Sequence, residues 1–312
     1  MWVLGFDTSN YATSLAVFDT CAGEVVYDKK KFLPVKPGQL GLRQSEAVFH
    51  HTEALPGLLE QLGQQADLTR VEAVGVSVKP RPVEGSYMPC FLVGQGAARA
   101  FAASKGLPVV QTTHQQGHMA AALYAAHRPE LFHRPCLVFH VSGGTTDLIL
   151  CEGVEKLTTI GTSSDLYAGQ AVDRVGVALG FGFPAGEMVS RTAAECDEFI
   201  RPKTSVKGMT CSLSGLENQC NRLLQDGKSP AYVCKYCLLC VGETVVRMAK
   251  AALEEHPGLP VICAGGVMSS GLIAEYVSHR LPDVTFVPGK FSSDNAIGVA
   301  VMAAREVAEW QK

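Results

Sequence analysis

Two segments with the same plan, about 135 residues apart, restrict the folds that this chain can adopt. The first is apolar from Val3 to Phe6, turns through polar residues 7–10, and is apolar again from Thr13 to Phe18. The second is apolar from Cys136 to Val141, turns at residues 142–146, and resumes at residues 148–150. Two apolar runs joined by a short polar turn indicate a β-hairpin. Two such hairpins predict a duplicated fold.

The segments between the hairpins alternate between strand-like and helix-like patterns. Short apolar runs predict strands at residues 73–78, 109–111, 261–264 and 285–287. Apolar residues at helical spacing predict helices at residues 45–62, 94–105, 119–126, 170–179, 231–255 and 295–309. Alternating strands and helices predict an α/β protein with at least partly parallel sheets.

Composition places the chain among globular proteins with two domains. It has 312 residues, of which 47% are hydrophobic and 18% charged, so a sizeable core is expected. The net charge of -3 does not by itself indicate a nucleic-acid partner. The N-terminal residues do not lead us to expect a secretory signal, no apolar run has the length of a membrane span, and the 11 cysteines are scattered and odd in number. These features predict a cytoplasmic protein with reduced thiols and no membrane partner.

Two glycine-containing turns follow predicted buried strands. Ser142-Gly143-Gly144-Thr145-Thr146 follows the strand ending at Val141, and Gly265-Gly266 follows the strand ending at Ala264. Glycine permits close backbone approach, so N–H groups at such turns can face an anion. Either turn alone could be an ordinary loop, but together they favour phosphate or nucleotide binding. The chain contains neither a Walker loop nor a G-x-G-x-x-G fingerprint.

His114-Gln115-Gln116-Gly117-His118 places two imidazoles four residues apart at a predicted strand end. On a helix these positions share a face, so both rings could bind one metal ion, although two surface histidines are the alternative. A zinc protease would need glutamate at the second position as general base, where this chain has Gln115, so we do not expect a peptidase. Asp294, at the predicted start of the last helix, could add a carboxylate suited to iron or zinc, or could simply cap that helix.

Other clusters are interpreted as structural. Cys234, Cys237 and Cys240 are spaced by three within an apolar helix-like stretch, which predicts a buried stripe of thiols rather than a metal cluster. His50 and His51 are expected on a helix surface.

Together these motifs resemble the TsaD/Gcp family over nearly the whole chain. The opening residues 3–9 resemble V-L-G-I-E-T-S, residues 114–118 resemble H-x-E-G-H, and residues 141–146 resemble V-S-G-G-H-T. Residues 169–174 resemble G-E-A-F-D-K, residues 183–186 resemble Y-P-G-G, and residues 212–216 resemble S-F-S-G-L. Residues 264–267 are identical to the family block A-G-G-V, and residues 293–295 resemble T-D-N.

The resemblance implies a fold of the actin–hexokinase–sugar kinase (ASKHA) type, with two RNase-H-like domains and a nucleotide in an interdomain cleft. The expected N-terminal half comprises residues 1–130 plus 290–312, and the C-terminal half residues 131–289. The final helix is expected to pack back on the N-terminal half.

The resemblance also implies a function. Family members transfer a threonylcarbamoyl group from an adenylate to adenosine 37 of tRNA, with one divalent metal (iron or zinc, magnesium being a further candidate) and ATP, AMP or the acyl-adenylate as ligand. The implied partners are nucleotide, tRNA and proteins similar to TsaB and TsaE. The implied metal ligands are His114, His118 and Asp294, and Asp7 and Tyr11 are the candidate catalytic residues. The implied nucleotide contacts are Ser142, Gly143, Gly144, Thr145, Gly169, Asp173, Gly186, Gly265, Gly266 and Ser270.

The chain departs from the family pattern at its expected site, which indicates a divergent paralogue. Tyr11 and Ala12 stand where the family has two carboxylates, and Thr145 stands in place of histidine. Gln116 replaces a glutamate, Ser270 replaces an asparagine, and the loop 79–86 differs from the family's G-P-G-L-x-G-S type. The departures leave three hypotheses: a transferase of this type, a non-catalytic nucleotide-binding partner subunit, or a small-molecule kinase or phosphatase suggested by fold alone.

Overall fold

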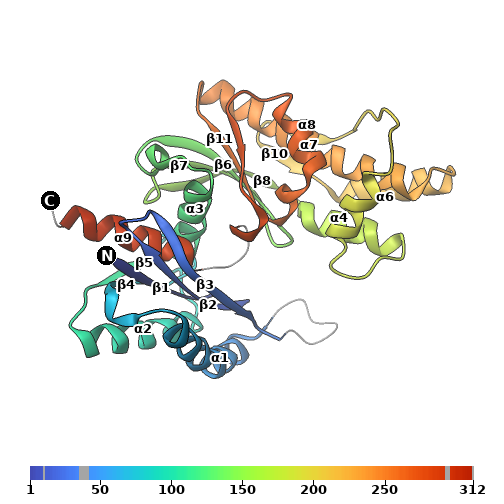
Figure 1. The fold of residues 1–312 in the computed structure, drawn as a ribbon. Coiled ribbons are helices and arrows are strands. Elements are labelled where there is room, and N and C mark those ends of the chain that lie inside the picture. Colours follow the sequence, from blue (N-terminus) through green and yellow to red (C-terminus); the bar gives the residue numbers. More distant parts are fainter. Residues whose placement is uncertain (10, 35–41, 292–295, 311–312) are drawn as a thin grey trace. The chain divides into compact units, whose positions relative to one another are not determined.

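The computed structural model describes residues 1–9, 11–34, 42–291 and 296–310 (Figure 1). They form two compact units, residues 1–132 with 293–312 (unit 1) and residues 133–292 (unit 2). Each unit has its own mixed sheet and its own helices, so each is described by itself.

Unit 1 is built on a five-stranded sheet in the order β3-β2-β1-β4-β5. Its elements are β1 (Trp2–Thr8), β2 (Ala12–Asp19), β3 (Glu24–Phe32), α1 (Gln44–Gln65), β4 (Val71–Ser77), α2 (Phe91–Lys105), β5 (Val109–Thr112), α3 (His114–Ala125) and α9 (Ile297–Trp310). β1 and β2 form the predicted hairpin, with Phe6 opposite Leu15, while β1, β4 and β5 run parallel.

Helices cover both faces of this sheet (Figure 1). On one face, Leu4, Phe6 and Leu15 pack with Leu55 and Leu58 of α1. On the other, α9 packs on β1 and β4 through a cluster that includes Val3, Ala73 and Ala303. The final helix therefore packs on the N-terminal sheet, as the sequence predicted.

Unit 2 is built on a seven-stranded sheet in the order β12-β11-β6-β7-β8-β10-β9. Its elements are β6 (Pro135–Val141), β7 (Thr146–Glu152), β8 (Leu157–Ser163), α4 (Ala168–Ala178), α5 (Gly186–Ala193), β9 (Ser205–Lys207), β10 (Thr210–Ser212), α6 (Ser214–Gln225), α7 (Pro230–Glu255), β11 (Val261–Ala264), α8 (Gly271–Ser278) and β12 (Val284–Phe286). Its core centres on α7, where Cys234, Cys237 and Cys240 are buried, as expected for a thiol stripe.

The two sheets share one strand plan, which confirms the predicted duplication. In unit 1, β1 pairs antiparallel with β2 and parallel with β4. In unit 2, β6 pairs antiparallel with β7 and parallel with β11. In each unit a third antiparallel strand pairs with the second strand of the hairpin (β3 with β2, and β8 with β7). A further parallel strand pairs with the crossover strand (β5 with β4, and β12 with β11). The corresponding strand orders are β3-β2-β1-β4-β5 and β8-β7-β6-β11-β12.

The expectation that both His50 and His51 lie on a helix surface is wrong for His51. Its side chain is fully buried, with Nδ1 2.7 Å from the Thr13 hydroxyl and Nε2 2.8 Å from the Ser9 carbonyl oxygen. Adjacent residues of a helix point about 100° apart, so only one of the two histidines can face the β1–β2 hairpin. The orientation in which α1 packs on the hairpin determines that this residue is His51.

Candidate functional site

The two histidines of the H-x-x-x-H segment converge at the start of α3. Thr113 caps the helix: its hydroxyl accepts from the Gln116 N–H, and the Gln116 side-chain oxygen accepts from the Thr113 N–H. His114 and His118 then occupy one helix face, and their Nε2 atoms lie 3.0 Å apart. Two imidazole nitrogens that face one another are a suitable start for a metal site.

Asp7 fixes the orientation of His114. Its Oδ1 lies 3.1 Å from His114 Nδ1 and also accepts from the Ser77 hydroxyl. A carboxylate on Nδ1 favours the Nδ1–H tautomer, which directs the Nε2 lone pair toward His118. Asp7 is fully buried, and its Oδ2 has no hydrogen-bond partner within the described part of the chain. Asp7 therefore orients His114 through Oδ1, while Oδ2 can accept a further hydrogen bond.

The described residues include two side chains that could bind a metal ion, His114 and His118. Among them, no group of three His, Cys, Asp or Glu side chains could hold a metal ion. Asp294, the carboxylate expected as third ligand, lies outside the described residues. The convergent Nε2 atoms and the Asp7 support fit a nitrogen-preferring metal such as iron or zinc, with two ligands from α3.

Tyr11, the second candidate catalytic residue, is exposed and stands immediately before β2. Its side chain is 48% exposed, and its carbonyl oxygen accepts from the Leu33 N–H. In the described structure no hydrogen bond joins its phenol to Asp7 or to either histidine.

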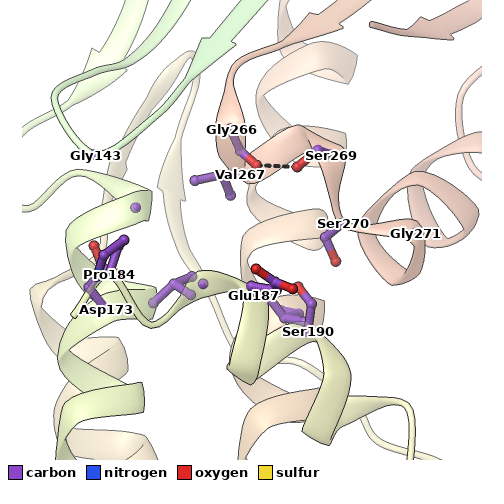
Figure 2. Close-up of a pocket in the computed structure, with 14 residues that line it drawn as sticks. Gly143, Asp173, Pro184, Glu187, Ser190, Gly266, Val267, Ser269, Ser270 and Gly271 are labelled. Carbon is purple, nitrogen blue, oxygen red and sulfur yellow. Dashed lines mark hydrogen bonds between the residues drawn. The ribbon is translucent and has the colours of Figure 1, made fainter. Parts of the chain in front are cut away.

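Unit 2 contains a pocket of about 560 Å³ in the region of its two glycine turns (Figure 2). Of the residues expected to contact nucleotide, Gly143, Gly169, Asp173, Gly186, Gly266 and Ser270 line it. Its volume lies in the range of small-molecule sites. The lining does not include Ser142, Gly144, Thr145 or Gly265.

Two glycines allow the backbones around this pocket to approach closely. A Cβ at Gly169, in the first turn of α4, would lie 2.6 Å from the Gly143 nitrogen. Gly265 has φ +107°, and a Cβ there would lie 2.1 Å from the Val141 oxygen. Gly265 thus acts behind the pocket, where only glycine fits both the backbone angle and the space.

Hydroxyls of the β6–β7 turn close the turn itself. The Ser142 hydroxyl accepts from the Gly144 N–H and lies 3.1 Å from the Thr145 hydroxyl. Thr146 accepts the N–H of Ala168 at the start of α4. These contacts explain why Ser142 and Thr145 shape the turn rather than line the pocket.

Asp173 and Ser270 present polar atoms at the pocket. Asp173 Oδ1 accepts from the Ala185 N–H at 2.8 Å, which holds the carboxylate in place. Ser270 precedes α8 as its cap residue, yet its side chain makes no capping hydrogen bond. Its hydroxyl is buried without a partner among the described residues (Figure 2). A buried hydroxyl usually has a partner, so this one is available to a ligand.

Sequence reasoning missed several lining residues, among them Glu187, Ser190 and Leu238. Glu187 and Ser190 lie three positions apart on α5 and therefore share its pocket face (Figure 2). Their i, i+3 spacing directly after Gly186 is the sequence signal that could have indicated two lining residues on one helix face. Leu238 belongs to the buried helix α7, where no sequence feature separates a lining residue from a core residue.

No helix in the described ranges is long and apolar enough to cross a membrane.

Comparisons with known proteins agree on a family and a fold. A family model described as tRNA N6-adenosine threonylcarbamoyltransferase matches residues 24–301. The tRNA N6-adenosine threonylcarbamoyltransferase of Streptococcus pneumoniae serotype 2 (strain D39) is 29% identical, covering 100% of this chain and 93% of the relative. The same values hold for the protein of strain R6.

Solved structures are similar in fold alone. Component A of the Acidaminococcus fermentans (R)-2-hydroxyglutaryl-CoA dehydratase has a TM-score of 0.58 at 12% identity, covering 99% of both chains. A ROK family glucokinase from Streptomyces griseus has a TM-score of 0.51 at 14% identity, covering 98% of this chain and 100% of the other. The fold is therefore of the actin–hexokinase–sugar kinase type.

Proposed function

We propose that this chain, which belongs to the tRNA N6-adenosine threonylcarbamoyltransferase family, transfers a threonylcarbamoyl or related carbamoyl group. The donor would be an acyl-adenylate and the acceptor adenosine 37 of tRNA. The observation that carries the proposal is the convergence of His114 and His118, with Asp7 bonded to His114. A pure scaffold would have no use for such an arrangement.

The pocket of unit 2 would hold the nucleotide part of the donor. The Asp173 carboxylate can accept hydrogen bonds from ribose hydroxyls while it keeps the Ala185 N–H. The buried Ser270 hydroxyl supplies a further hydrogen-bonding group. Gly143 and Gly266 leave backbone exposed at the pocket, where no Cβ blocks a phosphate.

His114, His118 and Asp294 would hold one divalent metal. Such an ion, when bound, polarises a carbonyl or phosphoryl oxygen of the donor. Two imidazole ligands favour iron or zinc over magnesium, which prefers oxygen. Asp7 keeps His114 in the tautomer that a ligand needs.

The test supplies the purified protein with threonylcarbamoyl-adenylate and a tRNA that reads codons starting with A. The modified nucleoside is measured by mass spectrometry and metal content by elemental analysis, with and without TsaB- and TsaE-like partners. His118→Ala should lose metal and lower the rate by roughly a hundredfold or more, because a Lewis acid contributes several kcal/mol. His50→Ala, at a surface histidine of α1, is the matched control and should keep both.

A second candidate is a non-catalytic nucleotide-binding subunit that acts on a partner protein. Tyr11 and Ala12, at positions where the family pattern has carboxylates, favour it. AMP binding by calorimetry without stoichiometric metal, and without product in any assay, would support this candidate and contradict the transferase.

A further inference from the structure

Unit 1 contains a second cavity, of about 530 Å³, that the proposed function does not use. It lies at the C-terminal end of α3, whereas His114 begins that helix. Its lining residues on α3, Leu123 and Tyr124, follow His118 by five and six positions, which is roughly 8–9 Å along the helix axis at 1.5 Å per residue, and neither histidine lines it. It is therefore a separate site within the same unit.

The walls of this cavity are apolar and partly aromatic. The side chains that form them come from β2, from the end of α3 and its following turn, and from α9: Phe18, Leu123, Tyr124, Phe132, Val301 and Ala304. Phe18 and Tyr124 meet edge to face at 5.7 Å, and Leu123, Val301 and Ala304 are almost fully buried. Side chains packed in this way form a cavity that exists before a ligand arrives.

Basic residues line the same cavity. The guanidinium carbon of Arg305 lies over the Phe132 ring, 4.2 Å from its centroid, so the charged group stands at the cavity wall. Arg128 donates from Nε to Glu130 at 2.6 Å, which fixes the second guanidinium. No carboxylate occurs among the described residues that line the cavity. The polar part of the lining is therefore complementary to an anion.

His127 also lines the cavity, in a backbone conformation that favours glycine. It follows α3 with φ 54°, in the left-handed region where helices usually end on glycine. A histidine there costs backbone strain but places a third basic side chain at the cavity.

We propose that this cavity binds a small organic anion with an aromatic body. The volume falls within the usual range of about 300–1,000 Å³ for small-molecule sites. The apolar walls take the body, and the stacked Arg305 guanidinium binds the acidic group by charge-assisted hydrogen bonds. The proposal is independent of tRNA, nucleotide and metal, so its failure would leave the proposed function untouched.

The test uses two fluorescent probes that share a body and differ in charge. 8-Anilinonaphthalene-1-sulfonate is an aromatic anion, and N-phenyl-1-naphthylamine is the same body without the sulfonate. The full-length protein should bind one equivalent of the anionic probe, and excess AMP should not displace it. Arg305→Gln should weaken the anionic probe roughly tenfold or more, because a charged hydrogen bond is lost. The same variant should leave the neutral probe unchanged.

Further variants distinguish binding in the cavity from non-specific binding of the probes to the protein surface. Ala308 lines the cavity and is exposed, so Ala308→Trp should fill it and abolish binding of both probes. Arg99→Gln on α2, an exposed arginine outside the cavity, is the matched control and should change neither. Melting temperatures check each variant's fold, and Arg128→Gln replaces Arg305→Gln if the latter is unfolded. Absent binding, displacement by AMP, or affinities unchanged in the cavity variants would overturn the proposal.

Discussion

At the start of α3, Gln116 occupies the position of a glutamate in the family pattern. Its side-chain oxygen accepts the N–H of Thr113, and it thereby completes a capping box. An amide oxygen accepts this hydrogen bond as a carboxylate would, so the change preserves the helix start that aims His114 and His118. This departure from the pattern therefore has a structural explanation, whereas nothing in the described contacts explains Tyr11.

His51 provides a pH-dependent prediction at the residue scale. Burial lowers the pKa of its imidazole, although the Ser9 carbonyl and Asp7 act in the opposite direction. A lowered folded pKa means that the unfolded state binds the proton more readily, so His51 contributes stability above its unfolded pKa of about 6.5, and this is lost as pH falls through the folded value. The free energy of unfolding, from urea titrations between pH 5 and 8, should fall toward acid in the wild type.

The control for this prediction is the neighbouring residue. His51→Gln should remove part of that pH dependence, whereas His50→Gln, at the helix surface beside Glu53, should keep it. Identical pH profiles for the wild type and His51→Gln would contradict the assignment.

Gly169 gives a second residue-scale prediction. An added methyl group would lie 2.6 Å from both the Gly143 nitrogen and the Ser142 oxygen, which are backbone atoms of a closed turn. Gly169→Ala should therefore cost about 1–3 kcal/mol in stability, as overpacking does, and weaken AMP binding. Gly96→Ala on α2, where the added methyl group meets nothing within 4 Å, should instead stabilise by up to about 1 kcal/mol. Denaturant unfolding and calorimetry measure both, and a neutral Gly169→Ala would show that the turn can move.

Among elements, the pairing of α3 with α9 links the two candidate sites of unit 1. The helices cross so closely that a Cβ at Gly298 would lie 1.8 Å from the Gly117 oxygen, next to His118. Ala121 of α3, whose nitrogen would lie 2.7 Å from the same Cβ, is fully buried at the crossing. The same pairing contributes walls to the apolar cavity at the other end of α3.

This crossing predicts that Gly298→Ala will separate the helices. The variant should be destabilised by about 1–3 kcal/mol, because two backbones must part to admit one methyl group. It should also bind less metal per protein, since α3 carries both imidazoles. Thermal unfolding and elemental analysis test this, with Gly57→Ala, at an open position of α1, as the control. Unchanged stability together with unchanged metal content would argue against the close packing.

At the scale of the whole molecule, unit 1 is completed by the last segment of the chain. Ala303, Ala304 and Val307 of α9 cover Val3 and Ala73 of the N-terminal sheet, while the core of unit 2 is built from residues between Leu137 and Leu281. Each unit therefore buries its own apolar surface, and only unit 1 depends on the C-terminal helix.

Deletion of residues 297–312 should therefore affect the two units unequally. Hydrogen exchange should show lost protection in β1, β4 and α3, because their apolar face is exposed to water, and retained protection in β6 and α7. The full-length chain is the reference. Equal loss of protection in both units would show that they fold as one cooperative body.

The family motifs identified many residues of the candidate site, but they did not predict which of these residues contact one another. Asp7 and His114 are far apart in sequence, and only the parallel arrangement of β1, β4 and β5 places them 3.1 Å apart. Glu187 and Ser190 were not predicted as pocket residues, because a helix of eight residues is too short to show a clear hydrophobic period. The aromatic and basic cavity residues come from three distant segments, so no local pattern joins them.

The features that could be predicted from the sequence are local: the two hairpins, the alternation of strands and helices, the buried thiol stripe of α7 and the i, i+4 histidines. These follow from hydrophobic period and turn chemistry, which act over a few residues. Three other features could be seen only in the folded protein: His51 is buried while His50 is not, the Ser270 side chain does not cap α8, and α3 and α9 line an apolar cavity. Those features depend on which surfaces meet, and burial and packing between distant segments are set by the fold as a whole.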